Sequence, residues 1–263
     1  MTYETITLKT DARGVARLTL NRPDKHNALN GKLIDELKQA ADQLAVDNNV
    51  RVVVLSGIGK SFCAGGDFNW FKANAESDRA TRIRESSKLA HMLNALNALP
   101  KPLIGRIQGS AYGGGIGMIS VCDIAVGVDT ARFGLTEVRL GLIPANISPH
   151  VVARIGMANS RATMLSGALF SAQKAEKIGL LNETVAPDDL DSRIDEIISE
   201  HLEAALGAVG ETKRLINYVA NHSMADNMIY TADRLADAWE TDEGTTGINS
   251  FLNKKLPPWR SKK

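Results

Sequence analysis

The chain has 263 residues, and its 31 Lys and Arg side chains nearly balance its 30 Asp and Glu side chains, for a formal net charge of +1. Hydrophobic residues make up 44% of the chain and charged residues 23%, which suits one large globular core or two smaller ones. A broad nucleic-acid-binding surface is not expected, because it requires a strongly basic chain.

Three features bear on where the protein resides. The first residues carry an acid at Glu4 and no apolar core, so we expect neither a signal nor a transit peptide. The longest uncharged stretch, 107–122, is shorter than the roughly 18–20 residues that span a bilayer. Cys63 and Cys122 form no disulfide framework, and we expect both to be small buried residues in a reducing compartment. A soluble cytoplasmic protein is the expectation.

Strands and helices alternate along the first part of the chain. In order, the periodicity predicts a hairpin of residues 3–8 and 15–20, a helix capped by Asn30, a strand at 50–55, a helix at about 78–99, a strand at 102–109, a helix at 113–122 and a strand at 123–128. This order is typical of an α/β core with parallel strands.

From about residue 188 the strand signals stop. The segments 189–206, 210–223 and 229–252 all have helical patterns, and no repeat or low-complexity linker separates them from the core. We therefore expect a core of residues 1–187 and a helical region of residues 188–263 that serves packing or assembly.

Two glycine-rich turns are the candidates for a functional site. "FCAGGD" (62–67) follows the strand at 50–55, and "GGG" (113–115) lies where a strand meets a helix. The second turn is not a P-loop, because no Lys-Ser or Lys-Thr follows it, and Met118 stands where a dinucleotide fingerprint needs glycine. One interpretation is that these glycines only allow the helix to pack closely on the sheet.

The two turns together favour a different interpretation. Each could aim one backbone N–H at the same carbonyl oxygen, which is the arrangement that stabilises an enolate or a tetrahedral oxyanion. Small residues allow the close approach that backbone donors require. We therefore predict that the N–H of Ala64 is a functional group.

The chain resembles the enoyl-CoA hydratase/isomerase (crotonase) superfamily from end to end. The matching segments are "LNRPDKHNALN", "GIGKSFCAGGDFNW", "KPLIGRIQGSAYGGGIGMISVCDIAV", "ARFGLTEVRLGLIP", "AEKIGLLNETV" and "FLNKKLPPW". The resemblance implies a spiral of ββα units, a helical C-terminal region, and homotrimers or hexamers. It also implies an oxyanion hole formed by Ala64 and Gly114 that binds a thioester carbonyl.

The resemblance assigns further residues to the site. Glu137 matches the glutamate that moves a proton at the α-carbon of the acyl group. Gly65, Gly66 and Asp67 would complete the substrate-binding turn, where the Asp67 carboxylate can accept backbone N–H bonds. Coenzyme A, which is part of the substrate, would be bound by residues Lys25, Ala28 and Lys254. No separate cofactor, metal, nucleic acid or membrane is expected.

One departure from the family concerns a second glutamate. Two-glutamate hydratases carry it three residues after the middle glycine, where this chain has Gly117. A single glutamate also suits a double-bond isomerase, so that alternative stays open. An acyl-CoA thioesterase with the same oxyanion hole and an RNA-binding relative are further alternatives.

A narrower resemblance favours hydration. "YGGGIGMISVCDIAV" and "LGLIPANISPHVVARIG" are similar to methylglutaconyl-CoA and isohexenylglutaconyl-CoA hydratases of leucine and terpene catabolism. This branch implies a branched acyl chain with a carboxylate and a pocket reshaped by residues Asn146, Ile147 and Pro149. Arg139, His150 and Arg154 are the candidates for binding that carboxylate.

Overall fold

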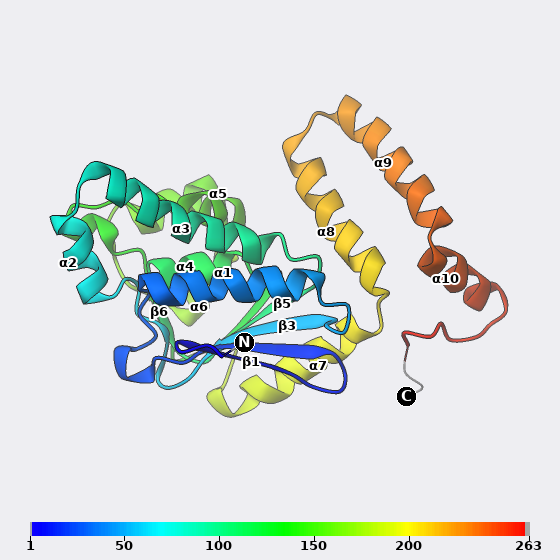
Figure 1. The fold of residues 1–263 in the computed structure, drawn as a ribbon, viewed down its shortest axis with the longest axis horizontal. Helices are drawn as coiled ribbons and strands as arrows, with labels where there is room; N and C mark the ends of the chain where they lie inside the picture. Colours follow the sequence, from blue (N-terminus) through cyan, green and yellow to red (C-terminus); the bar gives the residue numbers. More distant parts are fainter. Residues whose placement is uncertain (1, 261–263) are drawn as a thin grey trace.

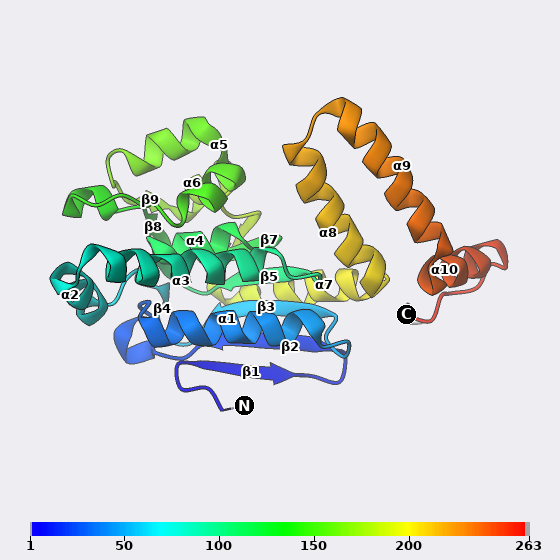
Figure 2. The same ribbon diagram turned by 45° about the horizontal axis from the view of Figure 1, so that its top comes forward.

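The computed structural model describes residues 2–260, which form two sheets flanked by helices (Figures 1 and 2). The larger sheet of this part of the chain consists of β1 (Ile6–Thr10), β2 (Val15–Leu20), β3 (Val52–Gly57), β5 (Leu103–Ile107), β7 (Ile124–Val128) and β10 (Glu183–Val185), in that order. β1 and β2 form an antiparallel hairpin, and the other neighbours pair in parallel. The prediction of an α/β core with parallel strands is confirmed.

Helices cover both faces of the larger sheet. The α-helices of residues 2–260 are α1 (Gly31–Val46), α2 (Phe68–Glu76), α3 (Arg79–Asn97), α4 (Gly114–Ser120), α5 (Ser148–Met164), α6 (Ala172–Lys177), α7 (Leu190–Leu202), α8 (Leu206–Asn221), α9 (Met224–Glu240) and α10 (Asp242–Leu252). In Figure 1 α1 and α3 lie above the sheet and α7 lies below it. Every residue of β3 is buried between these layers, which explains its run of apolar residues from Val52 to Leu55.

A smaller sheet of β4 (Ser61–Cys63), β6 (Ser110–Tyr112), β8 (Arg132–Gly134) and β9 (Phe170–Ser171) holds the functional turns. β4 and β6 pair in parallel, so their carboxyl ends lie side by side. Each then turns through glycines into a helix, α2 after β4 and α4 after β6. The sequence patterns do not predict this sheet, because strands of two or three residues carry no readable alternation.

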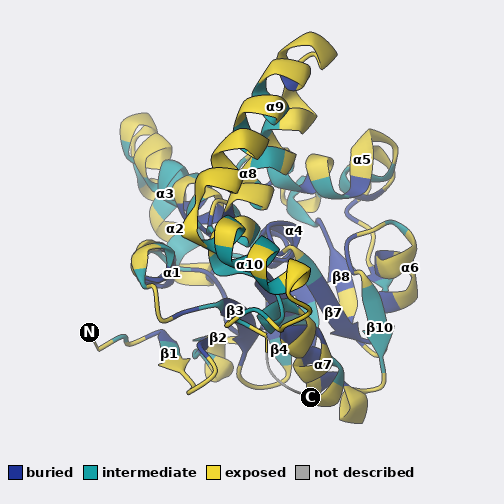
Figure 3. Ribbon diagram, turned by 90° about the vertical axis from the view of Figure 1, so that its right-hand side faces the viewer, coloured by how far each residue is buried: buried dark blue, intermediate teal, exposed yellow. Residues whose placement is uncertain are grey.

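The C-terminal helices α8, α9 and α10 form an arm that projects from the core (Figures 1 and 2). The segment predicted as one helix over 229–252 is broken at Thr241, whose Oγ1 caps α10 by accepting the N–H of Gly244. Much of the arm is exposed, including large apolar side chains such as Trp239 and Phe251 (Figure 3). No helix of residues 2–260 is long and apolar enough to cross a membrane.

Candidate active site

The two glycine turns lie against one another. Gly65 and Gly113 have φ angles of +91° and +48°, a backbone conformation that favours glycine. A Cβ atom on Gly113 would lie 4.0 Å from the Cα of Gly65. The parallel pairing of β4 with β6 therefore brings the backbones of two distant segments into contact.

The structure changes the assignment of the backbone donors. The N–H of Ala64 donates to the carbonyl oxygen of His26 at 2.9 Å, so the prediction that Ala64 supplies a free donor is wrong. Within residues 2–260, the N–H groups of Gly66 and Gly114 have no acceptor. Both glycines line the same cavity. Gly66 replaces Ala64 beside Gly114 as the candidate oxyanion hole.

Close packing explains why both donor positions are glycine. A Cβ atom on Gly66 would lie 2.4 Å from the ring of Phe71, and one on Gly114 would lie 2.4 Å from Cδ1 of Leu29. No side chain fits at either place without movement of its neighbour. The glycines thus leave the N–H groups accessible between two fixed apolar walls.

Asp67 holds the first turn in place, as the sequence predicted. Its carboxylate caps α2 by accepting the N–H of Asn69 at 2.9 Å, and it pairs with Nη2 of Arg22 at 2.9 Å. Burial opposes ionisation of Asp67, but hydrogen bonds from Arg22 and Asn69 outweigh it and lower its pKa. Arg22 also donates to the carbonyl of Ala28, which joins the turn to the segment before α1. Asp67 itself does not line the cavity.

Glu137 lies against the second glycine turn and lines the same cavity as the two free donors. It begins a 3₁₀ turn after β8, and its Oε1 lies 2.9 Å from where a Cβ atom on Gly113 would be. Its Oε2 is buried without a hydrogen-bond partner in the described chain. Burial raises the pKa of the Glu137 carboxyl, although a backbone hydrogen bond opposes the shift. A carboxyl group with a raised pKa next to free donors is suited to proton exchange.

These groups line a cavity of about 530 Å³ between α2, α3 and the loop before α5. Its walls are mainly apolar, with contributions from Ile34, Phe71, Leu89 and Ile143, and Asn146 and Ile147 line it as predicted. Glu137 is the only anion among the described lining residues, and Arg82 is the only cation. A pocket with an apolar wall and few polar groups is typical of a small-molecule site.

The space beside Gly117 is filled by apolar side chains. A Cβ atom on Gly117 would lie 2.5 Å from Cγ2 of Ile147 and 3.4 Å from Cδ1 of Leu93. The side chain of Ile147 therefore occupies the position where a second glutamate would begin. Glu137 has no carboxylate partner among the residues that line the cavity.

The three cations proposed to bind a substrate carboxylate do not line the cavity. The guanidinium of Arg154 donates to the carbonyls of Cys122, Gly179 and Leu180 and is structural. Arg139 donates through Nε to the carbonyl of Ser166. His150 lies in the first turn of α5, where burial lowers its pKa. Pro149 is likewise outside the lining.

The residues assigned to coenzyme A lie in two separate places. Lys25 and Ala28 belong to the segment that runs beside the first glycine turn, since His26 and Leu29 are bonded to it. Lys254 follows α10, at the opposite end of the molecule from the start of α1 (Figure 1). One chain does not bring Lys254 to the cavity.

The two cysteines are structural. Cys63 and Cys122 are both buried, as predicted. This burial raises the pKa of each thiol to about 12.

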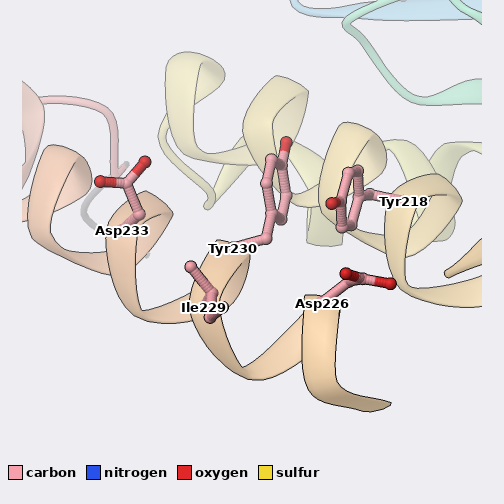
Figure 4. Close-up of a pocket in the computed structure, with 5 residues that line it drawn as sticks. All are labelled: Tyr218, Asp226, Ile229, Tyr230 and Asp233. Carbon is pink, nitrogen blue, oxygen red and sulfur yellow. The ribbon is translucent and has the colours of Figure 1, made fainter. Parts of the chain in front are cut away.

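A second hollow on the arm is lined by Tyr218, Asp226, Ile229, Tyr230 and Asp233 (Figure 4). The figure shows its two tyrosine rings side by side, and no glycine turn lies among its lining residues.

Both the sequence and the fold of this chain are similar to those of known proteins. Residues 10–262 match the family model described as "Enoyl-CoA hydratase/isomerase". The chain is 31% identical to the 2,3-dehydroadipyl-CoA hydratase of Escherichia coli, over 94% of this chain and 96% of that protein. A crystal structure of an enoyl-CoA hydratase from Shewanella pealeana superposes with a TM-score of 0.94 at 33% identity, covering 97% of this chain and 96% of that one. AtuE of Pseudomonas aeruginosa gives 0.94 at 32% identity, covering 98% and 100%. These neighbours confirm the predicted fold.

Replacing Gly117 tests whether the space for a second carboxylate is closed. Gly117→Glu should lower the free energy of unfolding by about 1–3 kcal/mol, because its side chain must displace Ile147 in a packed core. It should give no gain in turnover. The double variant Gly117→Glu/Ile147→Ala should recover part of the lost stability in urea unfolding. Gly31→Ala is the control, since its Cβ atom would have no neighbour closer than 3.8 Å. A fully stable Gly117→Glu single variant would contradict the packing argument.

Glu137→Gln separates the function of the carboxylate from the cost of its burial. We expect kcat to fall by roughly 10²–10⁴, the usual effect of removing an acid–base group. Burial raises the pKa of Glu137 above 4.5, its value in the unfolded chain. The free energy of unfolding of the wild type therefore falls as the pH rises from 4.5 through the raised pKa, because the carboxyl group must then ionise in a buried place. The variant should therefore melt at a higher temperature than the wild type near neutral pH, and this gain should vanish below pH 4.5. Steady-state kinetics and thermal unfolding against pH measure both effects, and near-normal turnover would refute the assignment.

Proposed function

The chain belongs to the enoyl-CoA hydratase/isomerase family, and from this membership we propose that it is a hydro-lyase that adds water to the double bond of an enoyl-CoA thioester. The observation that carries the proposal is the placement of Glu137 in one cavity with the free N–H groups of Gly66 and Gly114. A thioester oxygen bound by the two N–H groups would present its acyl carbons to the carboxylate.

The proposed reaction uses these groups in two steps. Glu137 takes a proton from water, the hydroxide adds to C3, and negative charge moves to the thioester oxygen. The N–H groups of Gly66 and Gly114 stabilise that charge, which is worth several kcal/mol in comparable sites. The protonated Glu137 then returns the proton to C2, so that one water is added in total. The raised pKa of Glu137 makes its carboxylate a stronger base and so favours the first transfer, from water.

We further propose that the acyl chain is branched and carries a carboxylate, as in 3-methylglutaconyl-CoA. Two observations support this. Ile147 fills the space beside Gly117, and Asn146 lines the same cavity. The relative from Escherichia coli is named for 2,3-dehydroadipyl-CoA, whose acyl chain ends in a carboxylate.

Double-bond isomerisation is the second candidate. It requires only that one carboxylate move a proton between two carbons, and the filled space beside Gly117 leaves Glu137 as the single carboxylate among the described residues that line the cavity. Both reactions share the thioester enolate, so the same donors would serve either one.

The products distinguish the two reactions. Incubated with 3-methylglutaconyl-CoA, the enzyme should give a product heavier by one water in mass spectrometry, with weak activity on crotonyl-CoA. A 3-enoyl-CoA tests isomerisation, and release of free coenzyme A tests thioester hydrolysis. No hydrated product, together with rapid migration of the 3-enoyl double bond, would establish the isomerase instead.

The arm supports a proposal about assembly. Large apolar side chains on α8, α9 and α10 are exposed in the single chain, among them Ile216, Met228, Ile229, Trp239 and Phe251. Such a surface is typical of a subunit interface. We propose a homotrimer or hexamer in the cytoplasm, in which the arm brings Lys254 to a neighbouring site and Lys25 contacts the coenzyme A phosphates. Light scattering should give a mass of three or six chains, and a monomer at micromolar concentration would contradict this proposal.

A further inference from the structure

Arg82 gives the cavity a charged end. It is the only cation among the described lining residues, and the sequence patterns did not single it out. It lies in the first turn of α3, and its side chain reaches the end of α2. The residues proposed earlier for a substrate carboxylate lie elsewhere, so Arg82 is the cation that the structure offers for that function.

The guanidinium of Arg82 is held by hydrogen bonds from Nε and Nη2, while Nη1 has no acceptor in the described chain. Nε donates to the carbonyl of Asn74 at 2.9 Å, and Nη2 donates to the carbonyls of Ala75 and Ser77 at 3.1 and 2.7 Å. These bonds close the C-terminal end of α2. In the described chain no acceptor is found for Nη1 and no carboxylate lies within ion-pair distance of the guanidinium, although its charge interacts at longer range with that of Asp78. A positive charge with spare N–H groups therefore borders the cavity.

The position of Arg82 along α3 shows which part of a substrate it can reach. Arg82, Ser86 and Leu89 line the cavity at helical spacing, and Leu93 continues this face to the space beside Gly117. With a rise of about 1.5 Å per residue, Ser86 lies about 10 Å and Arg82 about 16 Å along the helix from Leu93. Glu137 lies against Gly113, and Leu93 lies near Gly117, one turn further along α4. We therefore place the reacting carbons towards the Leu93 end of this face, so that Arg82 is nearer the distal end of the acyl chain.

The wall near Arg82 offers other polar groups. Asn74 and Ser86 line the cavity there, and Trp70 lies one turn before Asn74 on α2. The indole Nε1–H of Trp70 is buried without an acceptor in the described residues. Phe71 and Leu89 add apolar walls to the same cavity. A chain with an apolar middle and an anionic end is compatible with this lining.

We propose that Arg82 binds a carboxylate at the distal end of the acyl chain, through charge-assisted hydrogen bonds from Nη1. Arginine is suited to this because its guanidinium stays charged and its donors are fixed in a plane. For catalysis, this proposal rests on the hydratase function proposed above. As a statement about binding, it depends only on the cavity.

A structural function for Arg82 makes a different prediction. If Arg82 only closes the end of α2, its loss should weaken the binding of all acyl chains alike. If it binds a carboxylate, its loss should weaken only the chains that carry one. Adipyl-CoA and hexanoyl-CoA are suitable probes, because they have the same number of acyl carbons and differ in the terminal carboxylate.

Calorimetry on the full chain measures the dissociation constants of both probes for the wild type and variants. The wild type should bind adipyl-CoA more tightly, and Arg82→Gln should weaken that binding about 10- to 100-fold, the usual range for a hydrogen bond to a charged group. Hexanoyl-CoA binding should be unchanged. Arg82→Lys should retain part of the preference, and Arg84→Gln should retain all of it, because Arg84 lies on the same helix outside the cavity.

Two results would overturn the proposal: a wild type that shows no preference for adipyl-CoA, or an Arg82→Gln variant that weakens both probes equally. Should Arg82→Gln fail to fold, an Arg82→Lys variant that keeps part or all of the preference for adipyl-CoA, with hexanoyl-CoA binding unchanged, supports the proposal, and one that weakens the binding of both probes equally refutes it. Because binding is measured without turnover, an inactive enzyme that keeps the preference would count against the hydratase proposal alone.

Discussion

Two backbone N–H groups that the fold leaves without an acceptor, at Gly66 and Gly114, are the constraint on which the rest of the site depends. Backbone donors cannot swing towards a substrate, so the chain must place them. It does so by ending two paired strands, β4 and β6, at the same edge and turning both through glycines. Donors fixed in this way need no reorganisation when charge develops on a thioester oxygen. Phe71 and Leu29 close the space around them.

Two groups near these donors have opposite effects: an ion pair makes the first turn rigid, and a buried carboxyl group lowers the stability of the fold. The ion pair of Arg22 with Asp67 joins the first turn to the segment before α1 and is mostly buried, which favours a single arrangement of the turn. Glu137 is the opposite case. Its carboxyl has an oxygen with no partner in the described chain and a pKa raised by burial, so its ionised form is tolerated and not stabilised. Functional groups often lower the stability of a protein in this way, because the environment that makes them reactive does not stabilise the fold.

The sequence predicted the elements whose signals are local and missed those that depend on distant contacts. The hairpin, the Asn30 cap and α3 were found from periodicity and capping residues. Glu137 was found from its motif, although only the fold shows its burial. The sequence favours Ala64 as the donor, because the residues "FCAGGD" alone do not show that the carbonyl of His26, from another segment, accepts the Ala64 N–H. Arg82 lies in a helix rich in charge, and only the packing of α2 against α3 brings it to the cavity.

The central claim concerns which two N–H groups hold the thioester oxygen, and a crystal structure with a bound saturated acyl-CoA tests it directly. We expect the carbonyl oxygen to lie about 3 Å from the backbone nitrogens of both Gly66 and Gly114, within hydrogen-bond distance. The bond between the Ala64 N–H and the His26 carbonyl should be intact in that structure. A carbonyl oxygen bound to the N–H of Ala64, with the His26 contact broken, would contradict the account.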